Sequence, residues 1–374
     1  MFYEEFLKLN IEQIKTAVSS GDKNRAEIAV KKENVSYEDF LALLSPAAVS
    51  LLDDMALRSR EMTQKHFGKN INMYIPLYIS NECSNECVYC GFNRKNKINR
   101  KTLTLDEVKA ELEGIKNLGY NNILLLTGEA PDKAGLDYVA RCVALARKYF
   151  TQVSLEIYPM DVDGYKKLVD NGATGLTVYQ ETYDTETYKK VHLSGQKKNF
   201  EWRINTPDRA AQAGFRKIGI GALLGLYDWR TEAAYVGAHA AYIMKKYWKT
   251  EVSVSFPRMR GSSSAFKPYQ VISDKELVQM IFALRIFTKF AGITLSTREA
   301  ADFRDNMISL GVTNMSAGSK TNPGGYGGSE SEGQFEICDD RSVEEILSAI
   351  RSKGYYPVFK DWADTFGGNN ESIY

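Results

Sequence analysis

Short apolar runs alternate with amphipathic, helix-like stretches from residue 71 onward, and this alternation limits the fold more than any other feature. Eight runs have the length and composition of buried strands: 72–79, 122–127, 152–158, 175–180, 217–223, 251–256, 292–297 and 312–316. The helix-like stretches between them include 105–117, 137–149, 208–213, 229–246 and 274–290. Because strands that alternate with helices form parallel βα units, eight units predict an α/β fold with a closed, TIM-like (β/α)8 barrel.

The residues before the barrel read as helices. Phe2, Phe6, Leu9 and Ile11 begin an amphipathic pattern, and Ser36-x-x-Asp39 is typical of a helix start. We therefore predict three parts, which are an N-terminal helical extension (1–70), the barrel (71–335) and a C-terminal segment that packs on the barrel (336–374).

Cys83, Cys87 and Cys90 follow the first predicted strand with the spacing C-x3-C-x2-C, and they are three of the chain's five cysteines. The length and cysteine content do not suit a disulfide-stapled domain. A zinc site needs a fourth Cys or His nearby, and none of the three histidines is close. The spacing therefore favours a [4Fe–4S] cluster with three thiolate ligands and one open iron, with a zinc-stabilised binding module as the alternative.

Polar residues also follow the other predicted strands. They are 127–129, Glu156, 180–182, 225–228, 257–260, 298–299 and 316–319. Since chemistry in such barrels lies at the C-terminal ends of the strands, we expect one site there. Loops are polar in any case, so the pattern supports the barrel without proving it.

The cysteine spacing, with Tyr89 directly before the last cysteine, resembles the signature of the radical S-adenosylmethionine (SAM) enzymes. The resemblance implies a radical SAM barrel in which Cys83, Cys87 and Cys90 hold a [4Fe–4S] cluster. It also implies SAM, whose amino and carboxylate groups bind the open iron and which the reduced cluster cleaves to a 5′-deoxyadenosyl radical. Tyr89 is then expected beside the cofactor.

Thr127-Gly128-Glu129 resembles the family's Gly-Gly-Glu element, with Thr127 in place of the first glycine. The resemblance implies that the backbone and the Glu129 carboxylate accept hydrogen bonds from the SAM ammonium group. The alternative is a carboxylate near the start of the next helix. Gly221, Leu223, Gly225 and Asp228 resemble an adenine-contacting element with Asp for Glu, although an ordinary turn fits as well.

Three further charged residues are candidate SAM contacts. Glu156 and Glu181 are expected to bind the ribose hydroxyl groups or, for Glu181, the methionine ammonium group. The alternative for both is a solvated or salt-bridged position at the rim. Arg203 is expected to bind the SAM carboxylate through both arms of its guanidinium group, and an ordinary helix-surface arginine is the alternative. His192 is expected to be a structural loop residue.

Arg298 and Ser316 end neighbouring predicted strands. A guanidinium group and a hydroxyl group across a barrel mouth suit the carboxylate of an amino-acid substrate. A structural ion pair between Arg298 and Glu299 is the alternative. Cys142 and Cys338 are expected to have no role in the site.

Longer stretches resemble the aromatic amino-acid lyase branch of the radical SAM enzymes. They are 179–183, 202–209, 295–299, 316–319 and 360–362. The likeness is strongest to the tyrosine lyases of thiamine thiazole biosynthesis, and it implies cleavage of the Cα–Cβ bond of L-tyrosine to 4-cresol and dehydroglycine. Thiazole synthase and a flavodoxin or ferredoxin-type electron donor are the expected partners. A tryptophan-acting relative, the tyrosine lyase of hydrogenase maturation and a catalytically silent barrel remain alternatives.

The composition excludes several other classes of protein. A net charge of +1 gives no electrostatic footprint for nucleic acid or an anionic membrane. No apolar run is long enough to span a bilayer, and the N-terminus Met1–Glu5 has no signal-peptide core. We therefore expect a cytoplasmic enzyme, since a reducing compartment keeps the thiolates available.

Overall fold

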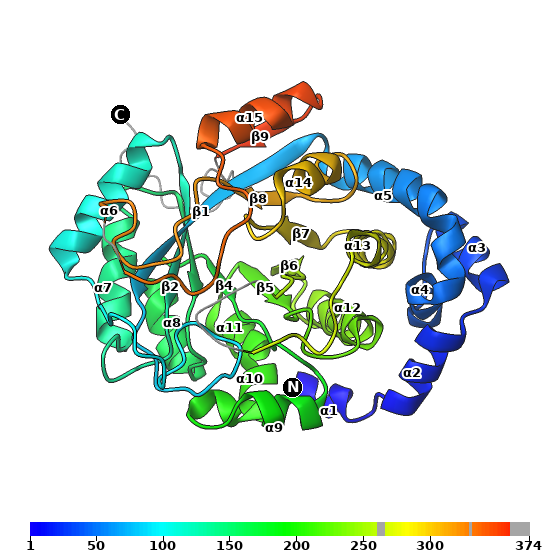
Figure 1. Cartoon of the computed structure of the whole chain (residues 1–374), viewed down its shortest axis with the longest axis horizontal. Coiled ribbons are helices and arrows are strands. Elements are labelled where there is room, and N and C mark those ends of the chain that lie inside the picture. The colour runs from blue at the N-terminus through cyan, green and yellow to red at the C-terminus, as the bar shows by residue number, and fades with distance from the viewer. Residues whose placement is uncertain (260–265, 329–330, 360–374) are drawn as a thin grey trace.

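The computed structural model describes residues 1–259, 266–328 and 331–359 (Figure 1). The predicted segment 336–374 and the stretch 257–260 therefore lie partly outside the described residues, and the stretch 360–362 lies wholly outside them.

Eight parallel strands form a closed barrel, as the sequence predicts (Figure 1). Neighbouring strands pair in chain order, and β2 also pairs with β1, which closes the ring. The strands are β1 (Asn70–Ser80), β2 (Asn122–Thr127), β3 (Gln152–Glu156), β4 (Gly175–Thr177), β5 (Lys217–Gly221), β6 (Glu251–Ser255), β7 (Gly292–Leu295) and β8 (Asn314–Ser316). All eight predicted strands are confirmed.

Several predicted boundaries are wrong. The strands β3, β4 and β5 end two or three residues before their predicted ends at 158, 180 and 223, and β8 begins at Asn314 instead of residue 312. The cause is that the apolar pattern continues beyond the strands into loops that are also buried. Leu223 and Tyr158, for example, are buried although they lie outside any strand.

Helices surround the barrel. They are α6 (Leu105–Asn117), α7 (Leu136–Ala146), α8 (Val162–Asp170), α9 (Thr185–Val191), α10 (Phe200–Ile204), α11 (Thr206–Ala213), α12 (Trp229–Lys246), α13 (Asp274–Thr288) and α14 (Ala301–Met307). The predicted helices 137–149 and 274–290 are each shorter at the C-terminal end than expected. The short helices α8, α9, α10 and α14 are not among the helix-like stretches named above.

The N-terminal residues form five helices, which wrap around the outside of α12 and α13 (Figure 1). They are α1 (Phe2–Phe6), α2 (Ile11–Ser20), α3 (Lys23–Lys31), α4 (Tyr37–Leu44) and α5 (Leu52–Phe67), with a 3-10 turn at Pro46–Leu51. Ser36 and Asp39 form the predicted capping box at the start of α4. Phe2 donates its backbone N–H to Asp208 of α11 at 3.0 Å, which ties this layer to the barrel.

The residues after the barrel form α15 (Val343–Ser352) and the short strand β9 (Tyr356–Val358), which the sequence did not predict. β9 pairs in parallel with the start of β1, so this segment returns to the barrel beside its first strand (Figure 1). The division of the chain at residues 70 and 335 stays a prediction.

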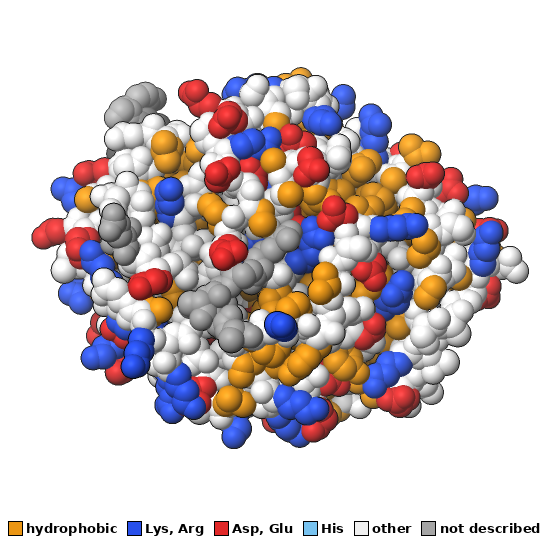
Figure 2. Space-filling model, in the orientation of Figure 1, with side chains coloured by type: hydrophobic (Ala, Val, Ile, Leu, Met, Phe, Trp, Pro, Cys, Tyr) orange, Lys and Arg blue, Asp and Glu red, His pale blue; other side chains and the backbone are white. Residues whose placement is uncertain are grey.

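Positive and negative side chains are mixed on the face shown in Figure 2, in keeping with the net charge of +1. Among the described residues, no single helix is long and apolar enough to cross a membrane; one sharply bent pair, Tyr37–Leu44 with Pro46–Phe67, passes by length and composition alone.

Candidate active site

The cysteine loop follows β1 and is held by a second segment of the chain. Val88 donates its backbone N–H to Val191 O at 3.0 Å, and Leu193 donates to Glu86 O at 2.9 Å. Cys87 and His192 form an antiparallel bridge. The segment 191–197, which follows α9, therefore lies alongside the loop and fixes its backbone independently of any bound group.

The three thiols line one cavity at the C-terminal ends of the first strands, which we name the thiol chamber. Its other lining residues include Asn85, Thr127, Gly128, Glu129, Glu156, Tyr179, Glu181, Lys197, Arg203 and Gln334. All of the predicted metal-binding residues and most of the predicted cofactor-binding residues thus meet in one place. Of the latter, Tyr89 packs beside the chamber instead of lining it.

The donor set suits an iron–sulfur cluster. Burial raises the pKa of Cys83 to about 11, and it raises the pKa of Cys87 and Cys90 as well, so burial by itself favours neutral thiols. Gln334 donates an amide N–H to the Cys90 sulfur at 3.8 Å. Within the described residues, no three His, Cys, Asp or Glu side chains converge on a single metal ion. A cubane cluster binds each thiolate through a different iron, so it needs no such convergence.

Gly128 allows the end of β2 to lie against the cysteine loop. A Cβ atom at Gly128 would lie 2.2 Å from the carbonyl oxygen of Glu82, so a side chain would push the two segments apart. Gly128 donates its N–H to Ser80 O at 3.0 Å, and Ser84 donates its N–H to Glu129 O at the same distance. The hydroxyl group of Thr127 has no hydrogen-bond partner among the described residues.

Glu129 and Arg203 form a buried ion pair, with Nη1 of Arg203 at 2.8 Å from Oε1 of Glu129. Arg203 also donates from Nε to Tyr179 O at 2.7 Å, and Asn85 donates to Oε2 of Glu129 at 2.8 Å. Burial raises the pKa of Glu129, but the charges of Arg203 and Lys197 outweigh this effect, and its pKa lies below the ordinary value. The helix-cap alternative for Glu129 and the surface alternative for Arg203 are therefore wrong.

Glu181 pairs with Lys197, whose Nζ lies 2.7 Å from Oε1 of Glu181, and both side chains are about nine-tenths buried. Arg203 is 3.7 Å from the same oxygen. Glu181 has a φ of +72°, which lies in the left-handed region that residues other than glycine rarely adopt. The buried Glu232 of α12 holds the next two residues, because it accepts the N–H of Tyr183 at 2.9 Å and the hydroxyl group of Thr182. Of the alternative for Glu181, a solvated position is therefore wrong, whereas a salt bridge is present.

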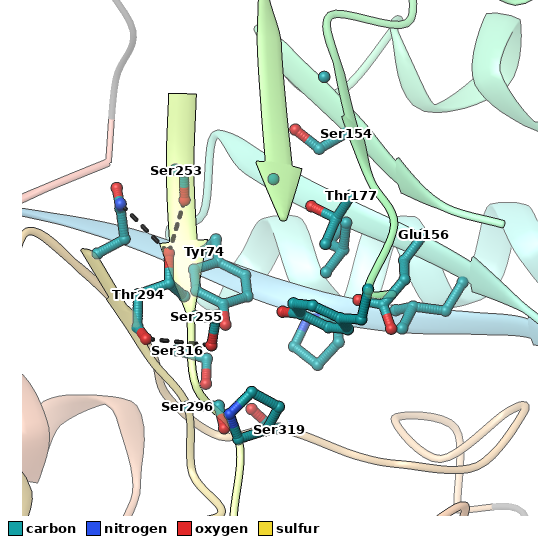
Figure 3. Close-up of a pocket in the computed structure, with 18 of the residues that line it drawn as sticks. Tyr74, Ser154, Glu156, Thr177, Ser253, Ser255, Thr294, Ser296, Ser316 and Ser319 are labelled. Carbon is teal, nitrogen blue, oxygen red and sulfur yellow. Dashed lines mark hydrogen bonds between the residues drawn. The ribbon is translucent and has the colours of Figure 1, made fainter. Parts of the chain in front are cut away.

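Glu156 ends β3 and lines two cavities, the thiol chamber and a larger one inside the barrel. Figure 3 shows its position in the second cavity. Burial raises its pKa to about 7, and the charge of Glu181 adds to this effect, whereas Arg298 opposes it. Glu156 therefore titrates near neutral pH, which is suitable for a group that exchanges protons.

The second cavity, which we name the barrel cavity, contains the two predicted substrate-binding residues. Arg298 and Ser316 both line it, together with Tyr74, Tyr78 and Phe335. The guanidinium group of Arg298 stacks 3.3 Å from the ring centre of Phe335. Glu299, the partner in the structural alternative, forms a buried ion pair with Arg258. Tyr78, Leu126, Glu156, Thr177 and Tyr179 line both cavities, so the two are adjacent.

The other residues that the sequence analysis names individually lie outside the thiol chamber. Asp228 caps the N-terminus of α12 by accepting the N–H of Thr231 at 2.9 Å, and it does not line the thiol chamber. His192 is buried, as a structural residue should be, and its Nε2 lies 2.8 Å from the hydroxyl group of Tyr89. Cys142 is buried and Cys338 is exposed, and neither lines the two cavities.

Sequence reasoning missed Asn85, Lys197 and Gln334. Asn85 lies between the first two cysteines, and that position is the one signal that could have identified it. Lys197 lies in a polar loop and Gln334 lies beyond the last barrel strand, so only the folded chain brings them to the chamber.

Two family models match the chain. The Radical SAM superfamily matches residues 77–235, and the Biotin and Thiamin Synthesis associated domain matches residues 255–356. The first match contains the cysteine loop, and the second contains Arg298 and Ser316.

Curated relatives match the chain along its whole length. It is 40% identical to a 2-iminoacetate synthase from Salmonella typhimurium over 98% of both chains. It is 39% identical to a 2-iminoacetate synthase from Escherichia coli over 100% of this chain and 99% of that protein. Among solved structures, HydG, a maturase of the [FeFe]-hydrogenase, is 30% identical with a TM-score of 0.90 over 97% of this chain and 81% of HydG. The chain therefore belongs to the 2-iminoacetate synthase family of radical SAM enzymes.

Proposed function

We propose that this chain is a radical SAM lyase that cleaves the Cα–Cβ bond of L-tyrosine to give 4-cresol and 2-iminoacetate. The observation that carries the proposal is the direct contact between the thiol chamber and the barrel cavity, which share five lining residues, within a chain about 40% identical to 2-iminoacetate synthases. This arrangement would allow a cofactor and an amino acid to lie side by side inside the barrel.

Cys83, Cys87 and Cys90 would hold a [4Fe–4S] cluster, with Tyr89 behind the loop and SAM in the rest of the thiol chamber. When bound, the cluster and SAM supply a 5′-deoxyadenosyl radical that abstracts a hydrogen atom from the substrate. The protein itself binds and orients the reactants and excludes water from them.

The charges of the thiol chamber complement those of SAM. Thr127, Gly128 and the Glu129 carboxylate would accept hydrogen bonds from the ammonium group, and Arg203 would turn to the carboxylate. Glu181 lines the chamber, and its carboxylate would bind a ribose or an ammonium group there. Glu156 would contact the ribose on one side and face the substrate on the other.

Arg298 and Ser316 would bind the substrate carboxylate at the mouth of the barrel cavity. The stacking of Arg298 on Phe335 holds the guanidinium plane in one orientation, which favours a bidentate contact with a carboxylate. The substrate amino group would then lie toward Glu156, where the two cavities meet.

The product and the electrons imply partners. We propose that thiazole synthase receives the 2-iminoacetate, because an imine hydrolyses readily in water, and that a flavodoxin or a ferredoxin-type protein supplies the electrons.

The alternative substrate is L-tryptophan, whose indole ring would have to fit the same cavity. The maturase activity of the HydG proteins is less favoured, because this chain is 30% identical to HydG and 40% identical to a 2-iminoacetate synthase.

An anaerobic turnover assay tests the proposal. Cluster-reconstituted protein with dithionite, SAM and L-tyrosine should form 4-cresol and 5′-deoxyadenosine in step. The variant Cys87→Ala should form neither, whereas Cys338→Ala, which changes an exposed cysteine outside both cavities, should be fully active. Formation of 5′-deoxyadenosine without 4-cresol would reject tyrosine as the substrate, and parallel reactions with L-tryptophan would identify the alternative. Failure to form either compound with an intact cluster would support the silent barrel.

A further inference from the structure

The inward-facing side chains of this barrel are unusual for the fold. The interior of such barrels is normally filled by layers of Val, Ile and Leu. Here many of the side chains that line the barrel cavity are small or polar, among them Asn72, Ser154, Thr177, Gly219, Ser253 and Thr294. Such residues leave a space that an apolar core would close.

The cavity has two chemically different sides. Pro76 and Leu124 lie opposite each other in register on β1 and β2, and they form an apolar side with Tyr74 and Tyr78. The strands β4, β6 and β7, none of which pairs with β1 or β2, carry a group of hydroxyl side chains that we name the hydroxyl wall. It consists of Thr177, Ser253, Ser255 and Thr294. An occupant with an apolar ring and a polar end would match both sides.

Hydrogen bonds arrange the hydroxyl wall around Thr294 (Figure 3). The hydroxyl oxygens of Ser253 and Thr294 are 3.0 Å apart, and Ser255 donates to Thr294 O at 3.2 Å. Gly219 lies opposite Thr177 in register, and a Cβ atom there would lie 2.4 Å from the Thr177 hydroxyl oxygen. A glycine at this position therefore keeps the hydroxyl group of Thr177 unobstructed.

Two buried polar atoms that line the cavity have no hydrogen-bond partner among the described residues. They are Oδ1 of Asn122, a residue that is 6% exposed, and the hydroxyl group of Ser319, which is 5% exposed. Buried polar atoms are almost always hydrogen-bonded in folded proteins. The cavity is therefore built for an occupant that brings hydrogen-bonding groups.

The depth of the cavity suits an aromatic amino acid. The predicted carboxylate contact, Arg298, follows the end of β7, whereas Thr294 lies within that strand. At a rise of about 3.3 Å per strand residue, Thr294 lies roughly two residues below Ser296 at the cavity mouth. An amino acid held at the mouth by its carboxylate would reach the hydroxyl wall with the far end of its side chain.

We propose that the hydroxyl wall, with Thr294 at its centre, binds the phenolic hydroxyl group of the substrate and so selects L-tyrosine over amino acids without that group. This inference rests on the proposed function. The apolar side holds the ring, and the hydroxyl wall exchanges hydrogen bonds with the phenol. A site built around a substrate hydroxyl group rejects analogues that lack it, because its own polar groups are then left unpaired.

Binding measurements test the proposal. L-tyrosine and L-phenylalanine are titrated calorimetrically, without reductant, into cluster-reconstituted enzyme that is saturated with SAM. The wild type should bind L-tyrosine at least tenfold more tightly than L-phenylalanine. Thr294→Val keeps the shape but loses the hydroxyl group, so it should lose most of this preference by weakening tyrosine binding alone. Thr294→Ser should restore it.

The control is Thr174→Val, because Thr174 lies just before β4, bonds to Val153 O and does not line the cavity. It should leave the preference unchanged. An unchanged preference in Thr294→Val would overturn the role of the hydroxyl wall while leaving the proposed function intact. Wild-type enzyme that binds neither amino acid would instead count against the proposed function itself.

Discussion

The side chain of Asn85 donates a hydrogen bond from Nδ2 to Oε2 of Glu129 at 2.8 Å. Its other atom, Oδ1, accepts the backbone N–H of Lys197 at 3.1 Å. A single amide between the first two cysteines thus joins the cysteine loop to the end of β2 and to the segment 191–197. These three parts of the chain form most of the thiol chamber.

Replacing Asn85 with Ala should weaken SAM binding while the cluster still assembles. Glu129 would lose one of the two side-chain partners that orient its carboxylate, a loss of about 1–3 kcal/mol when a buried acceptor loses its donor. We expect the dissociation constant of SAM to rise about tenfold in equilibrium dialysis. Asn171→Ala, which changes a partly exposed asparagine outside both cavities, is the control. An unchanged SAM affinity would show that Arg203 alone positions Glu129.

Gly195 tests how closely the segment 191–197 must approach the cysteine loop. It has a φ of +86°, and a Cβ atom there would lie 2.1 Å from Oδ1 of Asn85. Gly119 has a φ of +87° but no neighbouring atom within 4 Å of its Cβ position. Replacement of either by Ala should destabilise the fold by about 1 kcal/mol because of the backbone conformation.

The collision with Asn85 should add a second effect in Gly195→Ala only. We expect this variant to bind less iron per chain after reconstitution, whereas Gly119→Ala should bind as much as the wild type. Equal iron contents in the two variants would contradict a supporting role for this segment.

Lys197 should be important for stability even before any cofactor binds. Its ammonium group is surrounded by Glu181, Glu129 and the thiols, and the attraction of Glu181 keeps its pKa above the ordinary value despite burial and the nearby Arg203. Lys197→Met leaves Glu181 without its nearest cation, which should cost about 3 kcal/mol. Urea unfolding of the cluster-free protein measures this change. Lys198→Met, at the exposed neighbouring position, should unfold like the wild type.

Glu232 should make the stability depend on pH. Burial raises its pKa to about 8, so the folded protein keeps the proton between about pH 4.5 and 8, whereas the unfolded chain releases it. Stability from this group is therefore complete at low pH and is lost as the pH rises to about 8. Glu232→Gln resembles the protonated acid, so its melting temperature should fall less than that of the wild type between pH 6 and 8.5. The exposed Glu251→Gln should follow the wild-type curve.

Much of the fold could be predicted from the sequence because its signals are local. The eight barrel strands are short apolar runs between helical patterns, and burial of both faces of a parallel sheet produces such runs wherever the strand lies in the chain. The predicted ends of the strands were less accurate than their positions, since apolar residues at the ends of β3 and β4 continue into loops that are also buried. β9 has three residues and no distinct pattern, so only its pairing with β1 defines it as a strand.

The cysteine loop could also be predicted from a local signal, because the three thiols lie within eight residues of one another. Arg203 and Glu129 were also identified as candidates, but their ion pair joins residues 74 positions apart, and no local pattern encodes it. Lys197 and Asn85 have ordinary sequence surroundings, so their place at the thiol chamber was not predictable.

The sequence by itself therefore determined the barrel, the cluster-binding thiols and the family, because strand periodicity and ligand spacing are properties of short segments. The tertiary structure alone decided which charges neutralise one another in the thiol chamber, how the segment 191–197 supports the cysteine loop, and that the barrel interior has an apolar side and a hydroxyl wall. These features depend on closing the barrel, which brings together side chains from β1 to β8 whose distances cannot be read from their spacing along the chain.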